Sequence, residues 1–202
     1  CRIVGNLIGI YLSYANNTVI ELTNVLNAQQ TGIFVNHAHH CYVIDSTISN
    51  TGWQGLYIDS SPNCTLYGNI VNNTGQDALY INNSPDCDFQ GNTICNTPET
   101  GFHVESSEEI WLEDNTIYNC SEDGVSIFQS NNSTVYLNTV FNCTDRGISL
   151  ILSDDSLIRN NTAYDCKWLF SIDTSLNVTL DQNYGYNATQ SLLSISNSDE
   201  CK

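Results

Sequence analysis

A glycine followed by an apolar, a variable and a second apolar residue recurs along the chain at nearly constant spacing. The pattern starts at Gly9, Gly32, Gly55, Ala78, Gly101, Gly124 and Gly147, always 23 residues apart, and continues at Leu169 and Leu192. Within each unit, apolar and polar positions alternate over short β-branched runs separated by Asn, Ser, Thr or Gly. This period of two predicts strands, and nine matches in one register predict a repeat architecture.

Other positions keep the same period. Two apolar columns run through Ile20, Val43, Leu66, Phe89, Leu112, Val135 and Ile158, and through Val25, Ile48, Val71, Ile94, Ile117 and Val140. Asparagines align at Asn69, Asn92, Asn115, Asn138, Asn161 and Asn183. A unit of short strands buries its apolar face only by stacking on its neighbours. We therefore predict an all-β fold, a single parallel β-helix (solenoid) domain over residues 1–202, with about nine coils roughly 4.8 Å apart and asparagines hydrogen-bonded at the turns.

Coils that read G-h-x-h and then h-x-h-x-x-N-T-h, where h is apolar, resemble a known family of repeats. They are similar to the right-handed parallel β-helix proteins of the pectin-lyase-like superfamily, in particular its carbohydrate-binding and sugar-hydrolase repeats. The resemblance covers residues 5–200. It implies a right-handed coil but no single function, because this fold hosts lyases, hydrolases, epimerases, adhesins and inert rods. The Asn-Thr-Asp and Gly-His-Gly signatures of the related polygalacturonases are absent.

The chain is strongly acidic. Five Lys and Arg against 22 Asp and Glu give a net charge of −17, which excludes nucleic acid and anionic lipid as main partners. No apolar run approaches the roughly 20 residues of a membrane span. Four Asn-x-Ser/Thr sequons lie where turns should face water and are candidate glycosylation sites: Asn16, Asn72, Asn131 and Asn160. Acidity and sequons together predict an extracellular or cell-surface protein.

In the family that these repeats resemble, the G-h-x-h strand often lines the substrate groove. Its outward positions here include four aromatic residues and an amide, which are candidate ligand-binding residues: Tyr11, Phe34, Tyr57, Tyr80 and Asn82. Aromatic faces beside hydrogen-bonding groups suit sugar rings and equally suit protein interfaces. Alternatively, the aromatic residues are strand formers that stack on one another.

The catalytic candidates on the same face are Asp59 and Glu105, flanked by His103. Two coils separate the carboxylates by about 9.6 Å. That value is close to the roughly 6.5–9.5 Å of inverting glycosidases. Acidic residues are common in this chain, however, so a pair on one face can arise by chance. The related lyases use Arg or Lys, and Arg146, Arg159 and Lys167 lie away from the aromatic stretch. A non-catalytic role is therefore favoured, with hydrolysis as the alternative.

Two groups of side chains are candidate metal ligands, although no cofactor is required by the repeat. His37, His39, His40 and Cys41 offer soft ligands for copper or zinc, or form an ordinary polar turn. Acids precede the glycine position at Asp77, Glu99, Glu122, Asp123 and Asp145, where they could hold calcium or form a solvated acidic ridge.

Cysteines also follow the repeat, in two columns: Cys41, Cys64 and Cys87, and Cys120, Cys143 and Cys166. A spacing of about 4.8 Å lies within the Cα range of a disulfide. Because a column of three holds only one bridge, we expect either buried thiols or one disulfide per column.

Neither end of the sequence carries an amphipathic helix or polar cap, although solenoid ends normally need one. We expect end-to-end self-association, an open head-to-tail assembly. The alternatives are a piece of a longer surface protein and a self-sufficient monomer. The sequence thus favours a non-catalytic structural or adhesive rod, such as a filament or surface-layer subunit. One alternative is a carbohydrate-binding or glycoside-hydrolase-like protein that uses the G-h-x-h face and has a polysaccharide as its ligand. The other is a copper-binding periplasmic module.

Overall fold

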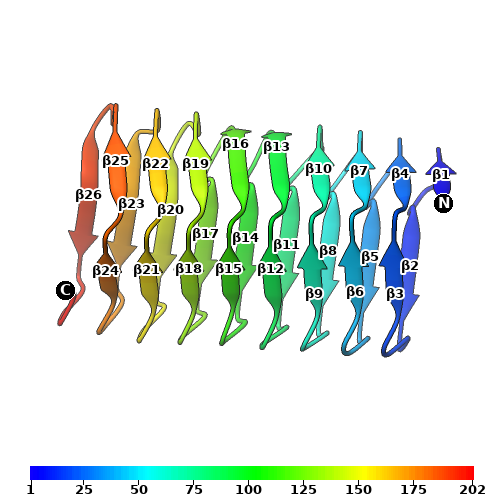
Figure 1. Ribbon diagram of the computed structural model, residues 1–202, viewed down its shortest axis with the longest axis horizontal. Helices are drawn as coiled ribbons and strands as arrows, with labels where there is room; N and C mark the ends of the chain where they lie inside the picture. Colours follow the sequence, from blue (N-terminus) through cyan, green and yellow to red (C-terminus); the bar gives the residue numbers. More distant parts are fainter.

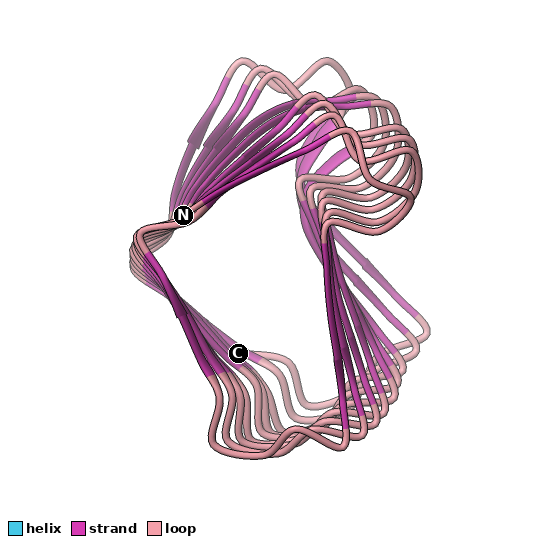
Figure 2. Cartoon of the chain, turned by 90° about the vertical axis from the view of Figure 1, so that its right-hand side faces the viewer, coloured by secondary structure: helices cyan, strands magenta, loops and turns pink.

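Each 23-residue unit folds into one coil of three short strands, and successive coils stack into a rod (Figure 1). The computed structural model describes residues 1–202, with strands β1 to β26 joined by turns. Figure 2, seen along the rod, shows the strands superimposed as three sides of one outline. None of the elements is a helix long and apolar enough to span a membrane.

Sheet A is formed by the third strand of each coil and begins with β1. Its nine strands, in order, are β1 (Arg2–Val4), β4 (Asn24–Leu26), β7 (Thr47–Ser49), β10 (Ile70–Asn72), β13 (Thr93–Thr97), β16 (Thr116–Cys120), β19 (Thr139–Phe141), β22 (Thr162–Tyr164) and β25 (Tyr184–Tyr186). Neighbouring strands are parallel, and Val71 pairs with both Ile48 and Ile94. The 23-residue register of the sequence is therefore the register of the sheet.

Sheet B contains the G-h-x-h strands. Its nine strands are β2 (Ile10–Ser13), β5 (Ile33–Asn36), β8 (Leu56–Asp59), β11 (Leu79–Asn82), β14 (Phe102–Glu105), β17 (Val125–Phe128), β20 (Arg146–Ile151), β23 (Trp168–Asp173) and β26 (Ser191–Ser196). Tyr80 pairs with Tyr57 on one side and with His103 on the other. Side chains two coils apart are thus next-nearest neighbours in one row.

Sheet C has eight strands. They are β3 (Val19–Glu21), β6 (Tyr42–Ile44), β9 (Thr65–Tyr67), β12 (Asp88–Gln90), β15 (Trp111–Glu113), β18 (Thr134–Tyr136), β21 (Leu157–Arg159) and β24 (Thr179–Asp181). With nine strands in sheets A and B and eight in sheet C, the chain makes eight complete coils and part of another. The predicted all-β parallel solenoid is confirmed.

The apolar columns meet inside the coil as one core of 39 buried residues. Space along its axis is tight at the glycine position. A Cβ on Gly124 would lie 2.2 Å from Val140 Cγ1 and 2.8 Å from the carbonyl oxygen of Gly147. A side chain at this glycine would force the neighbouring coil to shift. This explains why glycine begins six of the nine repeats, while Ala78, Leu169 and Leu192 occupy the position in the other three.

Asparagine side chains link the coils at the buried turn that leads from sheet C to sheet A, here called the inner turn. Asn115 is 1% exposed; its Nδ2 donates to Asn138 Oδ1 at 2.9 Å and to the Phe89 carbonyl at 2.8 Å. Its Oδ1 accepts from the backbone N–H and the Nδ2 of Asn92. A second set, including Asn50 and Asn73, occupies left-handed backbone positions at an exposed turn, which asparagine tolerates.

All nine cysteines are free thiols, and the members of the two columns are buried. The backbone N–H of Cys64 donates to Cys87 Sγ at 3.3 Å, and that of Cys143 donates to Cys166 Sγ at 3.4 Å. Hydrogen bonds between stacked thiols, together with burial, raise the pKa of Cys166. Of the two expectations for these columns, the structure has the reduced one, in which cysteine acts as a small apolar residue.

Candidate functional site

The outward face of sheet B carries the candidate ligand-binding residues. In β11, Leu79 and Ile81 are buried whereas Tyr80 and Asn82 are half-buried and point away from the core, and β5, β8 and β14 repeat this alternation. Two outward rows result. The first row contains Tyr11, Phe34, Tyr57, Tyr80 and His103, and the second contains Ser13, Asn36, Asp59, Asn82 and Glu105.

The aromatic residues of the first row stack on one another. Ring centroids of Phe34 and Tyr57 are 4.7 Å apart with an interplanar angle of 4°, and those of Tyr57 and Tyr80 are 5.0 Å apart at 19°. Tyr11 and His103 extend the stack at its two ends. Neighbouring rings therefore cover each other's faces, and a ligand above the sheet meets mainly ring edges.

A hollow of about 440 Å³ lies beside this aromatic row. Its lining residues are Ile8, Gln30, Thr31, Phe34, Trp53, Gln54, Tyr57 and Gln76. Trp53 is 47% exposed and belongs to none of the stacked pairs. Trp53 lies in the turn before Gly55, where its indole ring forms one wall of the hollow and is accessible to a ligand.

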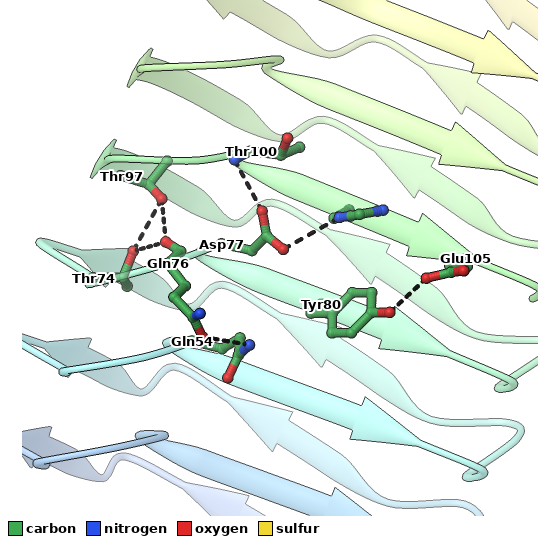
Figure 3. A network of polar contacts seen from close by, with 9 residues as sticks. Gln54, Thr74, Gln76, Asp77, Tyr80, Thr97, Thr100 and Glu105 are labelled. Atoms are coloured by element: carbon green, nitrogen blue, oxygen red, sulfur yellow. Dashed lines mark hydrogen bonds and ion pairs between the residues drawn. The ribbon is translucent and has the colours of Figure 1, made fainter.

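Amide groups complete the hollow. Gln54 Nε2 donates to Gln76 Oε1 at 2.9 Å, and Thr31 Oγ1 donates to Gln54 Oε1 at 3.2 Å. The backbone carbonyl of Gln76 accepts from the hydroxyl of Thr74 at 2.7 Å, which fixes the turn (Figure 3). An aromatic ring beside ordered amides is a combination that suits sugar hydroxyls and C–H faces. Sequence reasoning missed Trp53 and the three glutamines, although all four lie one or two residues before the first position of the repeated pattern.

The two candidate catalytic carboxylates are held by neutral partners. Asp59 Oδ1 accepts from Asn82 Nδ2 at 2.9 Å, and Glu105 Oε2 accepts from the Tyr80 hydroxyl at 2.5 Å. Asn82 lies between them, in register with Asp59 on one side and with Glu105 on the other. Burial, the hydrogen bond to Glu105 and its charge raise the pKa of Tyr80, so this phenol remains a hydrogen-bond donor.

Asp77 joins this site from the turn before β11. It is 8% exposed, and its Oδ1 accepts from the Thr100 backbone N–H at 2.9 Å (Figure 3). Its Oδ2 lies 3.2 Å from His103 Nδ1. Burial alone lowers the pKa of His103, but the hydrogen bond and charge of Asp77, together with Glu105, outweigh it and raise that pKa. The carboxylate thus orients the imidazole and favours its protonated form.

The acids before the glycine position do not form a solvated ridge throughout. Asp77 and Asp123 are buried, and Asp123 Oδ2 lies 3.3 Å from Arg146 Nη1. Burial raises the pKa of Asp123, and Arg146 offsets part of that rise. Asp145 pairs with Lys167 at 3.3 Å. Because Arg and Lys already neutralise these two carboxylates, the arrangement does not fit a calcium site.

The histidine-rich turn does not fit copper or zinc. His37 Nδ1 contacts Asn36 Oδ1 at 2.7 Å, while His39 and His40 are exposed. Cys41 is 1% exposed, and its thiol donates to the Ala15 carbonyl at 3.3 Å. Burial raises the pKa of Cys41, which disfavours the thiolate that a metal requires. No three His, Cys, Asp or Glu side chains of the chain are placed to share a metal ion.

The four candidate glycosylation sites have different surroundings. Asn16 is exposed, although its Oδ1 accepts from the His39 backbone N–H. Asn131 and Asn160 are half-buried in turns. Asn72 does not lie in a turn as expected: it ends strand β10 and is half-buried, with its Oδ1 enclosed and unpaired. The turn at this point begins one residue later.

Comparison with known proteins identifies the family. A family model described as "Right handed beta helix region" matches residues 54–202. The chain belongs to this family. The coil is therefore a right-handed parallel β-helix of the pectin-lyase-like superfamily, as the repeats predicted. A second model, described as "Periplasmic copper-binding protein (NosD)", matches residues 1–76 of this β-helix. No curated protein matches the chain.

Several solved structures have the same fold. The A-module of the mannuronan C-5 epimerase AlgE4 of Azotobacter vinelandii has a TM-score of 0.80 and 10% identity over 93% of this chain and 60% of its own. The periplasmic alginate epimerase AlgG has a TM-score of 0.67 and 14% identity over 92% of this chain and 57% of its own. Tailspike protein 2 of the Escherichia coli O157:H7 bacteriophage CAB120 has a TM-score of 0.76 and 12% identity over 98% of this chain and 35% of its own.

These identities show a shared fold alone. The β-helix described here spans between about a third and three fifths of the length of those three chains. The activities in their names therefore belong to longer proteins.

Proposed function

We propose that this β-helix is an exported rod that binds a polysaccharide along the outward face of sheet B and does not cleave it. The observation that carries the proposal is the hollow where the accessible ring of Trp53 meets the aromatic row and the amides of Gln54 and Gln76. Aromatic rings supply contact area for sugar C–H groups, and amides satisfy hydroxyls as donors and acceptors.

The repeat suits a polymeric ligand. Gln30, Gln54 and Gln76 line the hollow from three successive coils, so similar groups recur along the rod axis. A polysaccharide lying along this axis can repeat its contacts from coil to coil, whereas a single sugar uses only one set. Two of the structurally similar proteins are named as epimerases of mannuronan or alginate, which are polysaccharides, and this likeness supports the ligand class.

Binding without cleavage is supported by the surroundings of the two acids. An inverting hydrolase needs room for a sugar and a water between its carboxylates. The side chain of Asn82 lies in the row between Asp59 and Glu105, and its amide binds Asp59 at 2.9 Å. This arrangement favours a surface that recognises a sugar over one that activates water.

Export is supported by the net charge of −17 and by the exposed sequon at Asn16. The match of residues 1–76 to a family described as periplasmic and the likeness to a periplasmic epimerase agree with this location. We propose a periplasmic or extracellular site, and glycosylation at Asn16 where the host has that machinery.

The substitution Trp53→Ala tests the proposal. Oligosaccharides that bind on a glycan array are titrated calorimetrically, and the variant should bind them about tenfold more weakly, since loss of an aromatic contact costs about 1.4 kcal/mol. Trp111→Ala is the matched control, because Trp111 is 43% exposed on sheet C, away from the hollow. An array without any binding oligosaccharide, or equal losses in both variants, contradicts the proposal.

A second role, end-to-end stacking of rods, is favoured by the exposed apolar side chains of β26. Leu193 and Ile195 are 45% and 46% exposed, although they continue core columns through Phe170 and Ile172. Strand β2 lies at the opposite edge of the same parallel sheet. We propose that β2 of a second copy pairs with β26, which would continue the sheet and cover both side chains.

A further inference from the structure

The carboxylates bordering the proposed binding surface have no cationic partner. The chain contains no Lys or Arg between Arg2 and Arg146. Its ion pairs involve other acids, and Asp59 and Glu105 take part in none of them. Their contacts are the neutral amide of Asn82 and the neutral phenol of Tyr80. No Lys or Arg therefore neutralises these two charges.

These charges lie against aromatic rings. Asp59 follows Tyr57 by two residues in β8, and Glu105 is hydrogen-bonded to Tyr80 in the same stack. Burial and then the charge of Asp59 raise the pKa of Tyr57, so this phenol is also neutral. A carboxylate beside an apolar surface is incompletely hydrated, which strengthens its attraction for a cation.

The aromatic half of this face, from β2 to β14, contains no Lys or Arg, and Arg146 in β20 is paired with Asp123. His103 is the nearest ionisable cation, and its Nδ1 is directed to Asp77 at 3.2 Å. A polyuronate lying along the aromatic row would thus meet Asp59 and Glu105 with one histidine in compensation. Like charges at such short range oppose binding.

We infer that the polysaccharide bound by this face carries free ammonium groups, as a polymer of amino sugars does, and that Asp59 and Glu105 bind these groups while the Trp53 hollow holds a sugar ring. This inference rests on the proposed function. The two carboxylates are two coils apart, about 9.6 Å, so one chain along the rod axis reaches both.

Calorimetric titration with three oligomers of equal length tests the inference: glucosamine oligomers, N-acetylglucosamine oligomers and mannuronate oligomers. At mildly acidic pH and low salt, the glucosamine oligomer should bind at least tenfold more tightly than its acetylated form. Added salt should reduce that advantage, because it screens the ammonium–carboxylate attraction. The mannuronate oligomer should bind most weakly.

Variants separate charge recognition from sugar binding. Asp59→Asn combined with Glu105→Gln should remove the advantage of the glucosamine oligomer, so that the glucosamine and acetylated oligomers bind this variant with equal affinity. Trp53→Ala should weaken both oligomers. Asp114→Asn is the control for the loss of a negative charge, since Asp114 is exposed in a turn after β15.

The outcomes distinguish the two proposals. If both oligomers bind equally and both weaken in Trp53→Ala, the inference of an amino-sugar ligand is wrong and the proposed function stands. Tighter binding of mannuronate has the same consequence. If no oligomer of any kind binds, the inference and the proposed function both fail.

Discussion

The buried asparagines at the inner turn should contribute more to stability than their exposed counterparts, and Asn115→Ala measures the difference. The substitution removes four side-chain hydrogen bonds: two donated by Asn115 Nδ2 and two accepted by its Oδ1. Asn138 Oδ1 keeps the backbone N–H of residue 115 as a donor. Asn92 Nδ2 keeps the carbonyl of Leu66. The backbone N–H of Asn92, in contrast, loses its acceptor inside the protein.

The expected cost follows from these contacts. A buried donor left unpaired costs about 1–3 kcal/mol, and each other lost hydrogen bond costs about 1 kcal/mol. Asn115→Ala should therefore lower the free energy of unfolding by roughly 4–6 kcal/mol. Asn119→Gly is the matched control. It removes two amide contacts, to Asn96 and Asn142, but these are exposed, and glycine accepts the left-handed φ of 58° at this position. Its cost should be about 1 kcal/mol or less, because water replaces the lost partners.

Urea unfolding followed by far-ultraviolet circular dichroism and by tryptophan fluorescence provides the measurement. Solenoids can unfold in segments, so the free energies are compared only where both signals give one transition. Equal destabilisation by the two variants would refute the reasoning, because it would mean that burial of the amide is irrelevant.

Two further predictions concern pH and assembly. The raised pKa of His103 means that its protonated form stabilises the fold; this stabilisation is present below the ordinary histidine pKa of about 6.5 and is lost as the pH rises through the higher folded-state value. Thermal unfolding should therefore show wild type losing stability relative to His103→Gln as the pH rises from about 6 to 8, and parallel pH profiles would contradict this. For end-to-end stacking, sedimentation velocity should detect assemblies that Leu193→Asp combined with Ile195→Asp abolishes, and a wild type that stays monomeric at high concentration would contradict it.

The fold could be predicted because each column keeps one kind of residue from coil to coil. A 23-residue spacing places Asn92 on Asn115 and Tyr57 on Tyr80, and the structure pairs them in this way. The same logic identified the outward row of sheet B. Residues that are adjacent in a column are one repeat apart in the sequence, so the sequence alone specifies these contacts.

Contacts between columns could not be predicted in the same way. Asp77 and His103 are 26 residues apart, one coil and three residues, because a turn side chain reaches across to a strand in the next coil. Trp53 lines the hollow because of the direction in which its turn projects, and the repeat does not specify that direction. The repeat predicts a turn at the sequon of Asn72, but the left-handed residue that begins the turn is Asn73, with a φ of 53°.

Closeness in sequence also misled at the histidine-rich turn. His37 and His40 both have left-handed backbone conformations, with φ of 50° and 53°. The chain reverses direction between them, while the side chain of Cys41 points into the core. Four candidate ligand residues within five positions therefore do not converge, because a tight turn directs consecutive side chains apart.

The position of each acid along the rod, and not the total charge, decides what sheet B can bind. Asp77 and Asp123 occupy one column two coils apart, and each is satisfied inside the protein: Asp77 by His103, Asp123 by Arg146. Asp59 lies in the outward row, where only an amide reaches it. A net charge of −17 would repel every anion equally, but this distribution leaves the unpaired charge beside the aromatic row. A cationic sugar would therefore be attracted to the N-terminal half of the face, where the rings are, and not to the half that contains Arg146.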